Sequence, residues 1–161
     1  MDKEEITLTQ LVKNGGIYFN IEGSSKKEIV INLINALSSA ALPSCKRDLL
    51  LNAVMEREAL ISTGIENGIA LPHPRTPLLE EDEQPFVAIA FPRQPIDWET
   101  PDNKPVHTIF LIVSDSSKQH LNALTKINFL CMEKNFYSLI NAQAAEEEII
   151  SAIEETEKGW G

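Results

Sequence analysis

Cysteine is scarce in this chain of 161 residues, which contains only two, and they do not form a Cys-x-x-Cys pair. Cys45 and Cys131 lie far apart in apolar segments with helical spacing. We therefore expect two buried free thiols rather than a disulfide or a pair of metal ligands. Free thiols suit a reducing compartment, so we expect a cytoplasmic protein.

The chain is also poor in basic charge and in long apolar runs. Its 14 Lys and Arg residues face 24 Asp and Glu residues, which gives a formal net charge of −10. An acidic chain repels phosphates, so nucleic acid and anionic membranes are not expected as partners, and a basic protein fits better. No run approaches the ~20 apolar residues of a membrane span. The acidic residues 1–5 do not resemble a secretion signal, so we expect a soluble protein without membrane insertion.

The length is that of one ordinary domain, which we place at residues 1–161. The expected strands are residues 17–19, 69–71, 86–91 and 108–113. Three helices are expected to begin after Ser24-Ser25, Pro43-Ser44 and Asp115-Ser116, and a last helix is expected at residues 144–157. Apolar strands that alternate with helices predict an α/β fold, a single domain with a mixed, mostly parallel sheet flanked by helices on both faces. The proline-bounded segments 78–85 and 92–105 are expected to be surface loops.

The most informative segment is residues 62–75, Ser-Thr-Gly-Ile-Glu-Asn-Gly-Ile-Ala-Leu-Pro-His-Pro-Arg. Asn67-Gly68 tolerates the positive φ angles of a tight hairpin turn, and a short strand then ends at Pro72. Because prolines flank His73, its imidazole should lie on stiff backbone at a strand end, where open α/β sheets build sites. From Pro-His-Pro alone, a solvated loop histidine is the simpler interpretation.

The whole string resembles the active-site signature Ser-Thr-Gly-Ile-x-Asn-Gly-Ile-Ala-x-Pro-His. This signature is found in enzyme IIA domains of the fructose, mannitol and nitrogen-regulatory type, from the bacterial phosphoenolpyruvate:sugar phosphotransferase system. The similarity continues at residues 55–58, 95–98, 102–106 and 120–121, and so covers most of the chain. The resemblance implies that His73 carries a phosphoryl group, and that neither a metal nor an organic cofactor is needed.

Arg57 has the spacing of an apolar helical stripe. The stripe expected in this helix consists of Leu50, Ala53, Val54 and Ile61. From the residues alone, an arginine at the edge of the stripe, or paired with Glu56 or Glu58, is the simpler interpretation. The resemblance instead implies that Arg57 helps to hold the phosphorylation pocket.

His120 falls in the first turn of the helix after residues 114–117, where free N–H groups and the helix dipole attract phosphate. The apolar residues expected on this helix are Leu121, Leu124, Ile127 and Cys131. A half-buried structural histidine is therefore an equally good interpretation. The resemblance implies a second active-site histidine that orients the phosphate and senses its charge. His107, at the start of a strand, has only a structural interpretation.

Thr63 and Arg75 are expected in the environment of the phosphate, one through its hydroxyl and the other through its charge. Two departures from the family pattern matter here. Glu66 stands where glycine is frequent, and Pro74-Arg75 replaces the glycine that commonly follows the histidine. Glu66 adds negative charge beside a site that must accept more, so we expect it to weaken the donor's affinity, and Arg75 to offset this effect.

The sequence thus predicts a phosphoryl carrier, a protein-histidine phosphotransferase component. The resemblance implies that a histidine-phosphorylated carrier protein is the donor. It implies that the acceptor is an enzyme IIB or a target protein in nitrogen or carbon regulation. One alternative is a binding-only regulatory protein that docks its targets with little phosphoryl transfer, which Glu66 favours. Another is a metal site of His73, His107 and His120, which their spacing does not support.

Overall fold

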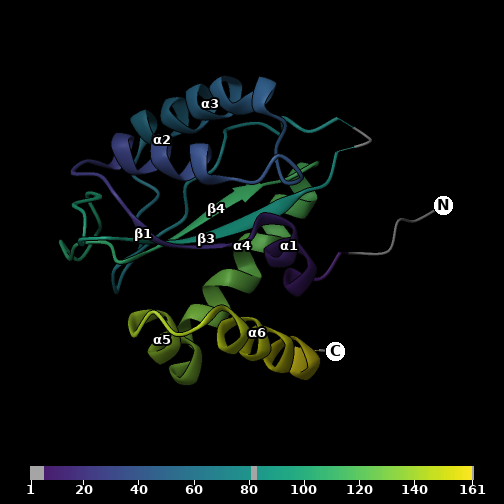
Figure 1. Cartoon of the computed structure of the whole chain (residues 1–161). Helices are drawn as coiled ribbons and strands as arrows, with labels where there is room; N and C mark the ends of the chain where they lie inside the picture. Colours follow the sequence, from purple (N-terminus) through teal and green to yellow (C-terminus); the bar gives the residue numbers. More distant parts are fainter. Residues whose placement is uncertain (1–5, 81–82, 161) are drawn as a thin grey trace.

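A four-stranded sheet lies between two layers of helices in the computed structural model, which describes residues 6–80 and 83–160 (Figure 1). Along the sheet the strands are β1 (Ile17–Ile21), β3 (Phe86–Pro92), β4 (Thr108–Val113) and β2 (Ile69–Ala70). The pairs β1–β3 and β2–β4 are parallel, whereas β3 and β4 are antiparallel. The predicted α/β fold with a mixed, mostly parallel sheet is therefore confirmed.

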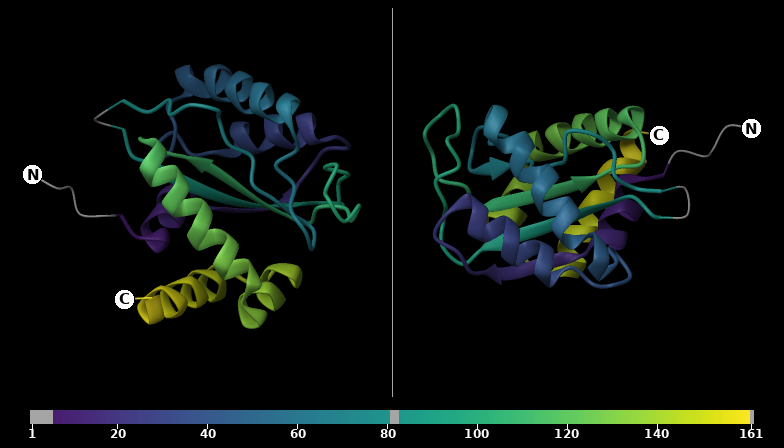
Figure 2. Two further views of the ribbon diagram at one scale, coloured as in Figure 1. Left: turned by 180° about the vertical axis from the view of Figure 1, so that it is seen from behind. Right: turned by 90° about the horizontal axis from the view of Figure 1, so that it is seen from above.

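Helices cover both faces of this sheet, as Figures 1 and 2 show. One face is covered by α2 (Lys26–Ala36) and α3 (Arg47–Leu60), the latter preceded by the 3-10 turn Ser44–Lys46. The other face is covered by α1 (Leu8–Gly15), α4 (Ser117–Met132), α5 (Lys134–Asn141) and α6 (Glu146–Trp160). The sequence did not predict α1 or α5. Within residues 6–80 and 83–160, no helix is long and apolar enough to cross a membrane.

The two central strands separate two hydrophobic cores. Every residue of β3 and β4 is buried. Successive side chains point to opposite faces, so Phe86 and Ala88 pack with α2 and α3 while Val87 and Ile89 pack with the other helices. Burial on both faces explains why these strands are continuously apolar, as predicted.

Three apolar residues expected in the interior are exposed. Ile61 is 68% exposed because it follows the end of α3, whose buried residues are Leu50, Val54 and Glu58. Leu121 is 65% exposed because Ala123, Ile127 and Leu130 form the buried face of α4, which places Leu121 on the opposite side of the helix. Cys45 is exposed because it lies in the 3-10 turn, which has no buried residue. Both cysteines are free, as predicted, and Cys131 is half-buried.

The segment 92–105 is only partly a surface loop. Ile96 and Val106 form an antiparallel bridge through backbone hydrogen bonds of 3.0 and 2.7 Å, which closes the segment on itself. Trp98, inside this closed segment, is completely buried and belongs to the core beneath α2 and α3. In the other expected loop, residues 81–82 lie outside the described residues, and Leu78 and Leu79 pack against that same core.

Candidate functional site

The hairpin turn predicted at Asn67-Gly68 is confirmed. Both residues have positive φ angles, 67° and 78°. Gly68 also has no room for a side chain, because an added Cβ would lie 2.4 Å from Cδ2 of His107. The carbonyl oxygen of Asn67 lies 3.1 Å from Nε2 of His107 and 3.0 Å from the hydroxyl of Tyr137. These contacts brace the turn and agree with the structural interpretation of His107.

The second arm of the hairpin carries the chain through β2 to His73. Across the two arms, the N–H of Leu71 donates to the carbonyl of Thr63 at 3.0 Å. The N–H of Ile112, on the neighbouring strand β4, donates to the carbonyl of Pro72 at 3.1 Å. The carbonyl of Leu71 also lies 2.7 Å from Nδ1 of His73. A carbonyl can only accept, so it favours the imidazole tautomer with the proton on Nδ1. The lone pair of the neutral ring is then on Nε2.

His120 lies directly against this ring. The ring centroids of His73 and His120 are 4.4 Å apart. His120 is in the first turn of α4, whose cap Ser116 accepts a hydrogen bond of 3.1 Å from the N–H of Gln119. The free N–H groups of this turn and the positive end of the helix dipole are therefore close to the histidine pair. The predicted placement of His120 is confirmed.

A small cavity opens beside the histidine pair. Its lining consists of Pro74, Arg75, Thr76, Pro77, Ile112, Ser114, Ser117 and His120. Ser117 is the first residue of α4, and the exposed Arg75 adds positive charge from the segment after His73. Hydroxyl groups, a cation and a helix N-terminus are the groups that bind a phosphate or another anion.

Burial keeps both imidazoles neutral near pH 7. Burial is the main cause of the lowered pKa of His73, and the charge of Arg57 lowers it further, whereas the Leu71 hydrogen bond and Glu58 oppose this. Burial, followed by the charges of His73 and Arg57, lowers the pKa of His120 to about 4. A neutral imidazole is the form that can act as a nucleophile.

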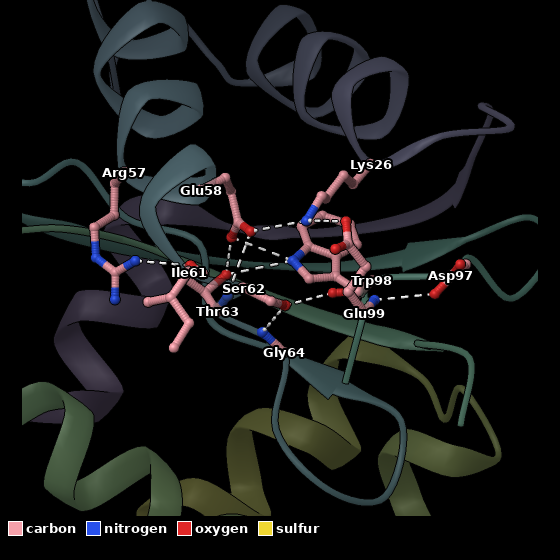
Figure 3. Close-up of polar contacts among 10 residues, drawn as sticks. All are labelled: Lys26, Arg57, Glu58, Ile61, Ser62, Thr63, Gly64, Asp97, Trp98 and Glu99. Carbon is pink, nitrogen blue, oxygen red and sulfur yellow. Dashed lines mark hydrogen bonds and ion pairs between the residues drawn. The ribbon is translucent and has the colours of Figure 1, made fainter. Parts of the chain in front are cut away.

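Arg57 lies in the last turn of α3 and is half-buried. Its guanidinium donates a hydrogen bond of 2.9 Å to the carbonyl of Ile61, beyond the end of the helix (Figure 3). Among the ion pairs of the described residues, Arg57 has no partner in Glu56 or Glu58. Its charge instead acts on both histidines. The structure thus brings together three of the residues selected from the sequence.

Thr63 is buried, and its hydroxyl donates to the carboxylate of Glu58 (Figure 3). The same carboxylate accepts hydrogen bonds from the N–H of Thr63 at 3.3 Å and the indole N–H of Trp98 at 3.2 Å. From the residues alone, Glu58 was considered only as an ion-pair partner of Arg57, and Trp98 was given no role. The available signal was the spacing of Leu50, Val54 and Glu58, an apolar stripe that ends on a carboxylate.

The remaining charged residue selected from the sequence, Glu66, is exposed at the hairpin tip. Across residues 6–80 and 83–160, no group of three or more His, Cys, Asp or Glu side chains is arranged to hold a metal ion. His107 is separate from the histidine pair in its bonding, since its Nδ1 contacts the hydroxyl of Thr108 at 2.7 Å and its Nε2 contacts the turn.

Comparison with known proteins identifies the family. A sequence model described as "Phosphoenolpyruvate-dependent sugar phosphotransferase system, EIIA 2" matches residues 10–156. The nitrogen regulatory protein of Escherichia coli is 32% identical over 134 residues, which are 81% of this chain and 80% of that protein. The fructose-specific EIIABC component of Bacillus subtilis is 28% identical over 153 residues, 94% of this chain but only 24% of that protein.

A solved structure has the same fold. It is the nitrogen regulatory protein IIA-Ntr from Neisseria meningitidis, which aligns with a TM-score of 0.76 at 24% identity and covers 90% of this chain and 97% of its own. The signature around His73, the family match and the relatives agree. The chain belongs to the EIIA 2 family of the phosphoenolpyruvate-dependent sugar phosphotransferase system.

Proposed function

We propose that this protein accepts a phosphoryl group on Nε2 of His73 and passes it to a second protein. The observation that carries the proposal is the 2.7 Å contact between Nδ1 of His73 and the carbonyl of Leu71. This contact leaves the lone pair of Nε2 free in a ring that packs against His120. Membership of a phosphotransferase family supports the same chemistry.

The transfer needs no cofactor. The lone pair of Nε2 attacks the phosphorus of a phosphohistidine on the donor, and the new P–N bond forms as the donor's P–N bond breaks. The electron pair of the broken bond returns to the donor's imidazole. Nδ1–H keeps its hydrogen bond to Leu71, which stabilises the positive charge that the ring of His73 gains. The same steps in reverse deliver the phosphoryl group to an acceptor.

The positively charged and N–H-donating groups of the site stabilise the transferred phosphoryl group. Arg57 and the exposed Arg75 supply fixed positive charge, and His120 and the first turn of α4 supply N–H donors. Thr63 does not contact the phosphoryl group in this proposal but helps to position His73. Its hydroxyl donates to Glu58, and its carbonyl accepts from the N–H of Leu71. His73 is the nucleophile, and Arg57 and His120 are the catalytic residues around it.

The donor in this proposal is a histidine-phosphorylated carrier protein in the cytoplasm, and the acceptor is an enzyme IIB or a regulatory target. The fructose-specific relative is an EIIABC component, which supports a IIB acceptor. The nitrogen regulatory relatives support a regulatory target. The net charge of −10 favours partners with a basic docking surface.

The test is labelling with radioactive phosphoenolpyruvate and the enzymes that phosphorylate the carrier protein. We expect one phosphoryl group per chain, stable in alkali and lost in acid, and none in His73→Ala. His120→Gln should still be labelled, more slowly, which distinguishes the two adjacent histidines. Full labelling of His73→Ala would refute the proposal. Unlabelled wild-type protein that still binds its partners would favour the binding-only alternative.

A further inference from the structure

A buried carboxylate lies behind the histidine pair. The side chain of Glu58, in the last turn of α3, is 1% exposed and belongs to the stripe formed by Leu50 and Val54. Burial of a carboxylate is costly unless it is paired and hydrogen-bonded, and an apolar residue would fill this position without that cost. Glu58 therefore has a role other than packing.

Both oxygens of this carboxylate are engaged. Oε1 accepts from the hydroxyl of Thr63 and, at 3.2 Å, from the indole of Trp98. Oε2 accepts from the N–H of Thr63 at 3.3 Å and lies 3.4 Å from the ammonium of Lys26. Figure 3 shows the carboxylate pointing from α3 toward these groups. Two of its contacts, one from the side chain and one from the backbone, hold the same residue, Thr63.

From Thr63, two further hydrogen bonds lead to the nucleophile. The carbonyl of Thr63 accepts from the N–H of Leu71 at 3.0 Å, and the carbonyl of Leu71 accepts from Nδ1 of His73 at 2.7 Å. Leu71, whose carbonyl fixes the proton of His73, is thus held by Thr63. Thr63 in turn is held by Glu58. A shift of Thr63 would move the carbonyl of Leu71 and weaken its selection of the tautomer.

Lys26 does not cancel the charge of Glu58. Its ammonium is shared with Glu99, whose carboxylate lies at 3.2 Å and is 73% exposed. One cation and two carboxylates leave a net negative charge. That charge acts on His73, which also faces Arg57 on α3 and His120 on α4, and it raises the pKa of His73 against the effect of burial.

We propose that Glu58 is a positioning residue for phosphoryl transfer, which acts through Thr63 and Leu71 to hold His73 in the Nδ1–H tautomer. The proposal rests on the proposed function of His73. Because the side chain of Glu58 is only 1% exposed, it should contact neither the phosphoryl group nor the partner protein. Its effect should therefore appear in the rate of transfer and in the state of the His73 ring, and not in the affinity for the donor.

The kinetic test uses substitutions that preserve side-chain volume. Glu58→Gln removes the charge, and Thr63→Val removes the hydroxyl but keeps the charge. We expect kcat for phosphorylation of His73 to fall about 10- to 100-fold in both, as small misplacements of a reacting group do, with KM for the donor unchanged. Thr63→Ser, which restores the hydroxyl, should recover most of the rate. The matched control Glu99→Gln alters the other partner of Lys26 and should keep the wild-type rate.

A second measurement reads the ring directly in the unphosphorylated protein. ¹⁵N NMR of histidine distinguishes the two tautomers and follows the pKa. Wild type and Glu99→Gln should show the Nδ1–H tautomer of His73, whereas Glu58→Gln and Thr63→Val should show a mixture of the two. Glu58→Gln should also lower the pKa of His73, because it removes a negative charge that favours the imidazolium.

These readouts separate the two proposals. Unchanged kcat and tautomer in both Glu58→Gln and Thr63→Val would overturn the role of Glu58, as would a rise in KM alone. An equal loss of rate in Glu99→Gln would also overturn it, because the Lys26 bridge and not Thr63 would then be responsible. Absence of labelling in the wild type would refute the proposed function, while the NMR result would still decide whether Glu58 positions the ring. If Glu58→Gln does not fold, Thr63→Val decides both tests.

Discussion

Phosphorylation of His73 is expected to protonate His120. In the free protein, burial and the charges of His73 and Arg57 lower the pKa of His120 to about 4, so the ring is neutral near pH 7. A phosphoryl group adds roughly −1.5 to −2 charges near neutral pH. It would arrive on a ring whose centroid lies 4.4 Å from that of His120. A nearby anion favours the imidazolium and so raises the pKa of His120.

The size of this effect follows from the separation of the groups. Two unit charges about 5 Å apart, at an effective dielectric constant of about 20, interact by about 3 kcal/mol. This energy corresponds to a rise in the proton affinity of His120 of roughly a hundredfold for each unit of charge. The positive charge that the ring of His73 gains offsets part of the phosphoryl charge, which leaves a net change of about one negative charge. From a pKa of about 4, this change is sufficient to protonate about half of the His120 rings at pH 6. The proton then balances part of the charge that the site has gained.

The assay is NMR of the histidine rings in free and phosphorylated protein between pH 6 and 8, where phosphohistidine survives. At lower pH, His73→Glu and His73→Gln form a stable pair of similar size that differs in charge. We expect a higher pKa of His120 in His73→Glu than in His73→Gln. Equal pKa values in this pair, together with a neutral His120 at pH 6 in the phosphorylated protein, would refute the charge-sensing role.

Three further predictions concern charges at other positions. Arg57→Ala should slow labelling by about 10- to 1000-fold and raise the pKa of both His73 and His120. Arg57→Lys should recover only part of the rate, because an ammonium cannot replace the planar guanidinium. Wild-type rates in both variants, measured by rapid quench, would contradict this prediction. Glu66→Gln should increase the rate at low ionic strength but not at ~1 M salt, and equal rates at every salt concentration would show that Glu66 acts only as a turn residue. Glu157 accepts from the N–H groups of Leu8 and Thr9 at 2.7 Å each and from the hydroxyl of Thr9. Burial alone would raise the pKa of Glu157, but these hydrogen bonds, the hydroxyl bond most of all, and the charge of Lys126 lower it. Glu157→Ala should therefore cost about 1–3 kcal/mol of unfolding free energy at pH 7. Because this stability is present above the ordinary Glu pKa of 4.5 and is lost as the pH falls below it, denaturant unfolding should show a smaller difference between variant and wild type at pH 3.

The parts of the site that could be predicted from sequence depend on local signals. Asn67-Gly68 adopts the turn that its residues favour, and Ser116 caps α4 so that His120 stands in the first turn. The central strands could be predicted because burial on both faces requires continuous apolar residues. In each case, a few neighbouring residues determine the conformation.

The features that were predicted wrongly or missed depend on tertiary contacts. Leu121 has helical spacing with other apolar residues, but the side of α4 that is buried depends on where the helix lies on the sheet. The short helices α1 and α5 are stabilised mainly by their neighbours, since isolated helices of this length are marginal. The role of Glu58 depends on Thr63 and Trp98, and nothing local shows that Trp98 enters the core from a proline-rich segment.

The groups on the two sides of His73 have opposite effects on a phosphoryl group bound to it. On the α3 side, Glu58 holds Thr63 through hydrogen bonds that already exist in the unphosphorylated protein, and its charge opposes the arrival of an anion. On the α4 side, His120 is neutral and can gain a proton once the anion has arrived. A carrier must release the phosphoryl group as well as accept it, and His120 and Arg57 stabilise only the bound group. Under the proposed role of Glu58, the same carboxylate that fixes the nucleophile repels the phosphoryl group and so favours its release.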